Sequence, residues 1–221
     1  MLRDWGRIRE QCIRTGVDSF PLVALVGFFA GSIIAWQAAY QFKGLISLSI
    51  MGGQATRVIV MEMGPVLTAL VISGRIGASM AAELGTMRLS EQIDALLTLA
   101  ISPIRFLALP RIVALTIMMP LLTFYANMIA IVGACFVSNY FLGITPETFF
   151  SSIQDFVEVK DIFGGIFKAV IFGALISGVS CHIGLKASGG SVGVGNATIQ
   201  AFVGSAVAVL ISDYILWIIL F

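Results

Sequence analysis

The last 25 residues, from Ala197 to Phe221, read ATIQAFVGSAVAVLISDYILWIILF and contain one charged side chain, that of Asp213. As an α-helix they extend about 37 Å, which exceeds the roughly 30 Å hydrocarbon core of a bilayer. A run this long and this apolar is typical of a membrane-spanning helix. It therefore determines the fold class.

Four earlier segments have the same character. They cover approximately residues 20–40, 58–82, 112–140 and 162–185. The whole chain is 58% hydrophobic and 11% charged, with a mean hydropathy of +1.01, whereas soluble domains carry about 25% charged residues. The sequence predicts an all-α integral membrane protein with five transmembrane helices in a single domain, 1–221. Pro120 predicts a bend or local break in the long third span.

The short connections differ in basic charge, and this predicts the orientation. One side carries Arg3, Arg7, Arg9, Arg14, Arg88, Arg105, Arg111 and Lys186; the other carries Lys43, Arg57 and Lys160. The amino terminus is therefore expected in the cytoplasm and Phe221 on the outer side. No cleavage pattern follows the first apolar run, so no signal peptide is predicted. The net charge of +1 argues against a nucleic-acid partner.

The first 18 residues show an amphipathic pattern. Leu2, Trp5, Ile8, Cys12 and Ile13 recur at helical spacing, and arginines fill the opposite positions. This predicts an interfacial helix over 1–18 with its basic face toward lipid headgroups. A solvated, partly ordered terminus is the alternative.

The connection between the second and third spans predicts a short helix over 86–100, capped by Ser90. Its apolar face consists of Leu89, Ile93, Leu96, Leu97 and Ala100. Such a helix can dock into a groove on a soluble partner, although an ordinary connecting helix has the same pattern.

Several motifs in and around this connection resemble one family. They are ELGTMRLSEQIDAL (83–96) followed by PIR (103–105) and LPR (109–111), EMGPVLTAL (62–70), GRIGASMAAE (74–83) and GVGNAT (193–198). Together they resemble the MlaE/YrbE permeases. The resemblance implies a homodimeric permease of an ABC system that moves phospholipid between the bacterial inner membrane and the outer envelope. It also implies two cytoplasmic ATPase subunits, which hold ATP and Mg, a ring of MCE-domain proteins and, in many systems, a STAS-domain subunit.

The resemblance also assigns candidate sites. It makes the 86–100 helix a coupling helix for the ATPase, with the polar residues Glu83, Arg88, Glu91, Gln92 and Asp94. The lipid cavity candidates are Glu62, Phe28, Phe29, Leu67, Leu70 and Val71. Glu62 is interpreted as a polar rim contact or as a carboxylate simply exposed at the interface. The apolar members could line the cavity, face lipid or lie in the core.

Charges inside spans need partners or a wet cavity, because each costs about 2.5–3.5 kcal/mol on insertion scales. Arg75 is expected to pair with Glu83 or to reach the cytoplasmic interface, and Lys168 to pair with Asp213. Gly27 and Gly31 form a G-x-x-x-G motif, which suits either a dimer contact or internal packing.

No motif in the chain predicts enzymatic chemistry. The glycine-rich GGSVGVG (189–195) is not followed by the Gly-Lys-Ser/Thr of a P-loop, so ATP hydrolysis is expected on a partner subunit. The single histidine, His182, predicts no metal site. Cys12, Cys135 and Cys181 predict no disulfide framework.

Other functions are less well matched. A secondary transporter of a small solute would need intramembrane charges for a coupling ion, and the chain shows no inverted repeat. A scaffold that only anchors the MCE ring is a second alternative, and a membrane-embedded enzyme is a third. Within the family resemblance, an importer of sterol or other hydrophobic nutrients would have a similar permease.

Overall fold

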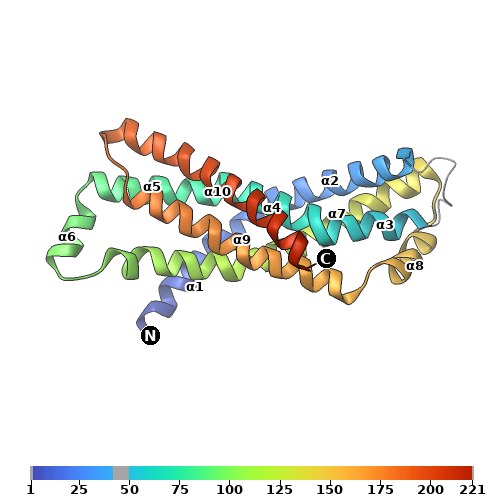
Figure 1. Cartoon of the computed structure of the whole chain (residues 1–221), viewed down its shortest axis with the longest axis horizontal. Coiled ribbons are helices and arrows are strands. Elements are labelled where there is room, and N and C mark those ends of the chain that lie inside the picture. The colour runs from blue at the N-terminus through green and yellow to red at the C-terminus, as the bar shows by residue number, and fades with distance from the viewer. Residues whose placement is uncertain (1, 42–49, 221) are drawn as a thin grey trace. The chain divides into compact units, whose positions relative to one another are not determined.

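The computed structural model describes residues 2–41 and 50–220, and side chains from Gly6 onward (Figure 1). Some predictions therefore fall outside the described residues or side chains, namely those for Leu2, Arg3, Trp5, Lys43 and Phe221. Within the described ranges the chain is almost entirely helical and forms no β-strand. The predicted all-α class is confirmed.

In the described ranges, five helical segments are long and apolar enough to cross a membrane, as predicted. They are Gly6–Gln41, Met51–Leu89, Ile104–Leu142, Val159–Leu185 and Gly190–Leu220. The second begins earlier and ends later than the expected 58–82, and the fifth begins before Ala197. Hydropathy does not detect these helix ends, because the residues there are polar or glycine-rich although they are still helical.

Contacts divide the chain into two compact units. The described parts of Met1–Ser19, Ala69–Pro120 and Ala169–Phe221 form unit 1, and those of Phe20–Thr68 and Leu121–Lys168 form unit 2. All four unit boundaries lie within these long helical segments.

In unit 2, a stripe of small residues on α2 (Phe20–Gln41) packs against α7 (Leu109–Leu142). The buried positions of α2 recur every four residues at Val23, Gly27, Gly31, Ala35 and Ala39. A Cβ atom on Gly27 would lie 3.0 Å from the Ala126 carbonyl oxygen, and one on Gly31 would overlap the Ala130 carbonyl oxygen. The G-x-x-x-G motif thus serves internal packing, one of its two predicted uses.

Unit 2 also contains an amphipathic helix that the sequence analysis did not predict. Helix α8 (Pro146–Phe156) begins with Pro146 after the N-cap Thr145, whose hydroxyl accepts a hydrogen bond from the Thr148 amide. It packs on α3 (Met51–Val58), where the Gly53 amide donates to Ser152 Oγ at 2.9 Å.

Unit 1 is built from similar close contacts among α5 (Ala78–Leu89), α9 (Val159–Leu185) and α10 (Gly190–Leu220). Figure 1 shows α5 and α10 side by side. Buried residues recur every four positions at Ser73, Gly77, Ala81 and Gly85. A Cβ atom on Gly77 would lie 2.9 Å from Ser180 Oγ. The Ser180 hydroxyl in turn lies 3.3 Å from that of Ser205 on α10.

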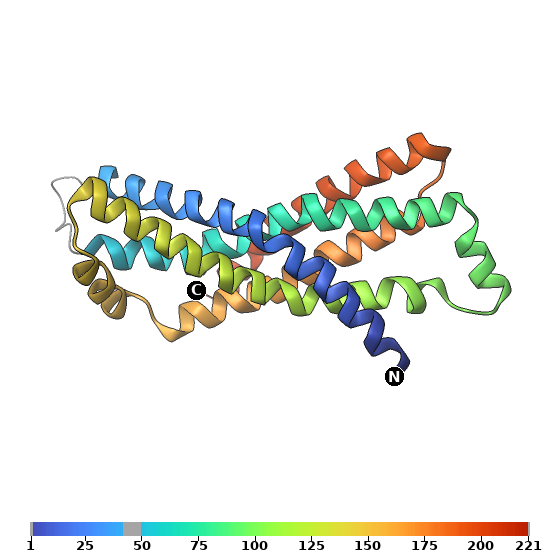
Figure 2. The same ribbon diagram turned by 180° about the vertical axis from the view of Figure 1, so that it is seen from behind.

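The amino-terminal helix belongs to unit 1. Helix α1 (Leu2–Gly16) continues through a 3-10 turn, Val17–Ser19, directly into α2. Gly16 lies against the Met118 side chain of α7, and Figure 2 shows the dark blue α1 crossing the green part of α7. The predicted helix therefore forms, and its position at a lipid interface stays a prediction.

The connection between α5 and α7 differs from the predicted single helix. Helix α5 ends at Leu89 and α6 runs only from Gln92 to Thr98, because Glu91 between them adopts a left-handed conformation with φ 58°. The predicted Ser90 N-cap is wrong: the Ser90 hydroxyl donates to the Thr86 carbonyl at 2.9 Å, at the carboxyl end of α5.

Among the residues that the structure describes, three π-helical turns interrupt the long segments, at Ile59–Met63, Ser73–Gly77 and Ile104–Ala108. Helix α7, by contrast, continues through Pro120 as one α-helix. The predicted local break at this proline is therefore absent.

Large apolar side chains lie on the outside of the helices. On α10 the side chains of Val203, Val207, Leu210, Ile211, Tyr214 and Ile218 are exposed, while Ala197, Ala201 and Ser205 are buried. This distribution is the reverse of that in water-soluble proteins, and it suits helices that contact lipid tails.

The contact between α2 and α7 generates a prediction. Gly31→Ala places a methyl group on the Ala130 carbonyl, and overpacking of this kind costs about 1–3 kcal/mol. We expect a lower thermal midpoint for the purified chain in detergent. Gly178→Ala on α9 is the control, because a Cβ atom there meets nothing within 4 Å. Equal midpoints for the two variants would contradict the packing described.

Candidate functional site

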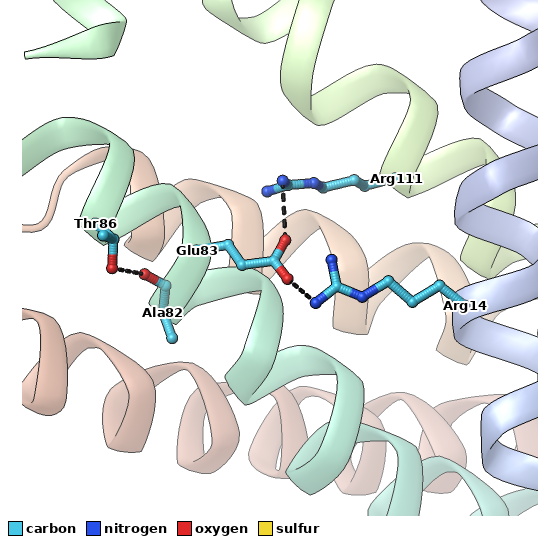
Figure 3. A network of polar contacts seen from close by, with 5 residues as sticks. All are labelled: Arg14, Ala82, Glu83, Thr86 and Arg111. Carbon is cyan, nitrogen blue, oxygen red and sulfur yellow. Dashed lines mark hydrogen bonds and ion pairs between the residues drawn. The ribbon is translucent and has the colours of Figure 1, made fainter. Parts of the chain in front are cut away.

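A carboxylate near the end of α5 connects three helices of unit 1. The Arg111 Nη2 atom, near the start of α7, donates to Glu83 Oε2 at 3.1 Å. Arg14, on α1, forms an ion pair with the other carboxylate oxygen of Glu83. Figure 3 shows the two guanidinium groups approaching the carboxylate from different helices. The prediction that Arg75 pairs with Glu83 is wrong, because Arg75 donates instead to Ser19 Oγ.

The two ion pairs of Glu83 differ in their surroundings. The Arg111 side chain is 6% exposed, that of Glu83 is 26% exposed and that of Arg14 is 54% exposed. A buried guanidinium depends on its counter-charge, and removing one partner of such a pair costs about 3–5 kcal/mol. Solvent-exposed pairs contribute only about 0–1 kcal/mol. Glu83 is therefore the counter-charge on which the buried Arg111 depends, whereas its pair with the exposed Arg14 contributes little to stability.

The other predicted coupling residues gather around α6 and are all exposed. Arg88 pairs with Asp94 at 2.8 Å, and Gln92 Nε2 donates to Ser90 Oγ at 3.0 Å. Arg88, Glu91 and Asp94 line a cavity of about 280 Å³ together with the loop before α10. The structure thus groups these residues, while Glu83 lies apart in the network of Arg14 and Arg111.

The predicted apolar face of the connection is divided. The Ile93 side chain is 3% exposed and packs inward, whereas those of Leu89 and Leu97 are 51% and 54% exposed. The outer surface of this connection therefore combines apolar and charged groups.

In unit 2, an ion pair joins the second and fourth spans. Glu62 lies in the π-helical turn Ile59–Met63, and its Oε2 atom accepts a hydrogen bond from Lys168 Nζ at 2.8 Å. The Lys168 side chain is fully buried, and that of Glu62 is 30% exposed. Both residues are candidates from the sequence, but their pairing with each other was not predicted. The expected pairing of Lys168 with Asp213 stays a prediction.

The apolar cavity candidates lie on two helices. Phe28 and Phe29 are on α2, with ring centroids 5.8 Å apart, and Phe29 is exposed. Leu67, Leu70 and Val71 are half-buried on α4 (Gly64–Ile72). Leu67 belongs to unit 2, and the other two belong to unit 1. Their assignment as walls for acyl chains stays a prediction.

Sequence reasoning also missed a second ion pair of unit 2. Arg57 Nε lies 3.0 Å from Asp161 Oδ2, and the Asp161 side chain is 2% exposed. From the sequence, Arg57 was predicted only as one of the basic charges in the connections on the outer side of the membrane. The useful signal is that a charge beside an apolar run needs a partner.

Another polar cavity, of about 370 Å³, lies where α9 and α10 meet in unit 1 and is lined by residues that include His182, Lys186, Asn196 and Gln200. His182 is exposed here rather than packed in the core. Of the cysteines, Cys181 is buried and Cys12 and Cys135 are partly buried, and all three are free.

In the described part of the chain, five apolar helical segments with close small-residue contacts and an ion pair between spans define a multi-pass membrane protein. Residues 8–219 match the family described as Permease MlaE, and the chain belongs to this family.

The chain is also similar to named proteins, two of which are described as probable ABC transporter permeases. The chain is 38% identical over 217 residues to a probable ABC transporter permease protein of Rickettsia typhi, covering 97% of this chain and 83% of that protein. It is 37% identical to one from Synechocystis, covering 94% and 79%. It is 34% identical to the chloroplastic protein TRIGALACTOSYLDIACYLGLYCEROL 1 of Arabidopsis thaliana, covering 96% and 61%.

The chain is therefore the membrane permease of an ABC transporter. This displaces the secondary transporter and the membrane-embedded enzyme that the sequence left as alternatives. It also means that an ATPase partner supplies the energy.

The Glu83 network generates a stability prediction. Glu83→Gln leaves the buried Arg111 without its counter-charge, and we expect the free energy of unfolding to fall by about 3–5 kcal/mol. Arg14→Gln should lower it by no more than about 1 kcal/mol. The measurement is SDS-induced unfolding in mixed micelles, with Glu91→Gln, at an exposed position, as the control. Equal losses for Glu83→Gln and Arg14→Gln would contradict the assigned roles.

Proposed function

We propose that this permease moves phospholipid between the bacterial inner membrane and the outer envelope. It acts as a homodimer, with two separate cytoplasmic ATPase subunits that bind ATP and Mg, and with a ring of MCE-domain proteins on the outer side. A STAS-domain subunit is a further expected partner. Membership of the MlaE family supports this assembly, and the surface at α6 is the observation that carries the ATPase contact.

The connection at α6 suits docking to a soluble subunit. It exposes Arg88, Glu91, Gln92 and Asp94 beside the apolar Leu97. A mixed surface of this kind matches a protein groove better than a lipid surface, where exposed acids are repelled by anionic headgroups. Docking there requires this side of the membrane to be cytoplasmic, which agrees with the basic charge of Arg88, Arg105 and Arg111.

A lipid cargo is supported by three features. The Arabidopsis relative is named for trigalactosyldiacylglycerol, which is a lipid. The Glu62 carboxylate is partly exposed while it neutralises the buried Lys168, so a polar headgroup can reach it without uncovering the lysine. Half-buried Leu67 and the phenylalanines of α2 provide apolar surface for tails. Sterol or another hydrophobic nutrient is the alternative cargo, and a pure scaffold is the alternative role.

The ATPase contact can be tested by charge reversal. In Glu91→Lys/Asp94→Lys, two exposed acids become basic and the Arg88–Asp94 pair is lost. We expect the co-purified ATPase to fall at least tenfold while membrane insertion is unchanged. The control is Glu147→Lys/Asp155→Lys, which reverses two exposed acids on α8 in unit 2. Unchanged ATPase recovery with the first double variant would contradict docking at α6.

The cargo can be tested by native mass spectrometry of the complex from its own membrane. Leu67→Trp should fill apolar space beside the second span, so we expect several-fold less bound phospholipid and slower ATP-driven transfer. Leu25→Trp, at an exposed position of α2, should change neither. If the chain is only a scaffold, neither variant should change lipid transfer. If the bound molecule has the mass of a sterol, the alternative cargo is correct and phospholipid is not.

A further inference from the structure

Helix α1 contacts both helical segments that flank the connection containing α6. Before the connection, Arg14 pairs with Glu83 on α5. After it, the Arg7 guanidinium carbon lies 3.8 Å from the ring centroid of Phe106, in the π-helical turn Ile104–Ala108. Arg7 and Arg14 are two helical turns apart and so lie on one face of α1.

The carboxyl end of α1 is firmly held within unit 1. Thr15 and Ser19 are almost fully buried, Gly16 lies against Met118, and Ser19 accepts a hydrogen bond from Arg75. A helix fixed at this end can hold other groups in place along its length.

The connection itself has little internal support. From Leu89 to Ser102 its side chains are exposed except for Ile93 and the half-buried Leu96. Glu91 and Ala100 both adopt positive φ, which interrupts regular helix on each side of α6. The geometry of such a segment depends on how its two ends are fixed.

We propose that α1 acts as a clamp on the connection, with Arg14 and Arg7 as the positioning residues that hold the helical segments before and after it. Through this clamp, α1 keeps α6 in the geometry in which it transmits ATPase movement to the spans. The transmission rests on the function proposed above, whereas the clamp rests on the contacts of unit 1.

The arginines of α1 therefore have different tasks. Arg7 stacks on an aromatic ring, a contact that a planar guanidinium favours, and Arg14 meets a carboxylate. Arg9 is exposed on the same helix, so its side chain is free to contact solvent or anionic headgroups. Arg9→Gln is thus a matched control that removes the same charge from the same helix.

Hydrogen exchange of the purified full chain in nanodiscs tests the clamp without any ATPase. We expect Arg14→Gln to raise amide exchange at least threefold in residues 92–108, which Arg14 itself does not contact, as well as in α1. Arg7→Gln should do the same, Arg14→Lys should restore much of the protection, and Arg9→Gln should leave 92–108 unchanged. Faster exchange confined to residues 2–19 would overturn the clamp, because it would show a purely local role.

Reconstitution with the ATPase tests the consequence. We expect Arg14→Gln to assemble normally but to move several-fold less lipid per ATP hydrolysed than Arg9→Gln. An unchanged ratio would overturn the positioning role of Arg14. If no ATPase binds the wild-type chain, the proposed function is contradicted. The hydrogen-exchange experiment still tests the clamp in that case, because it needs no ATPase.

Discussion

The structure depends on one constraint of the bilayer: apolar side chains gain nothing by leaving lipid for the protein interior. Helices must therefore associate through close backbone approach, which only small residues permit. Gly31 against Ala130 in unit 2, and Gly77 against Ser180 in unit 1, show this contact. The four-residue spacing of such positions keeps them on one helix face, and large side chains such as Ile211 and Phe29 are left to face lipid.

The same constraint explains the ion pairs. A lone charge among closely packed helices has neither water nor space, so it must meet a partner from another helix. Lys168 meets Glu62 across 106 residues of sequence, and Arg111 meets Glu83 across 28. Glu62 lies in a π-helical turn, and another π turn ends directly before the helix that carries Arg111. A π turn adds a residue to the helix and changes the register of the side chains that follow.

Hydropathy and motif content predicted the five spans, the fold class and the family, because these follow from length, apolarity and local residue order. The split between α5 and α6 was not predictable, since nothing in Ser90-Glu91 favours a left-handed glutamate. Helix α8 was not predicted, because hydropathy detects long apolar spans and does not detect short amphipathic helices. The sequence predicted which residues belong to the site but not which of them are in contact. Glu83 was predicted, whereas its partners Arg14 and Arg111 lie on distant segments that reach Glu83 only in the folded chain.

The network around Glu83 has a mechanical consequence for an ATP-driven permease. Its carboxylate connects α1, the end of α5 and the start of α7, and these last two helices leave and re-enter the membrane on either side of α6. Under the docking proposed at α6, a force applied there reaches two spans at once, since both of its flanking helices share one carboxylate. The buried Arg111 makes its link to Glu83 costly to break, whereas the exposed pair of Arg14 adds little to stability and positions α1 against α5. We infer that the second and third spans respond to the ATPase as a pair, with α1 setting how freely they follow it.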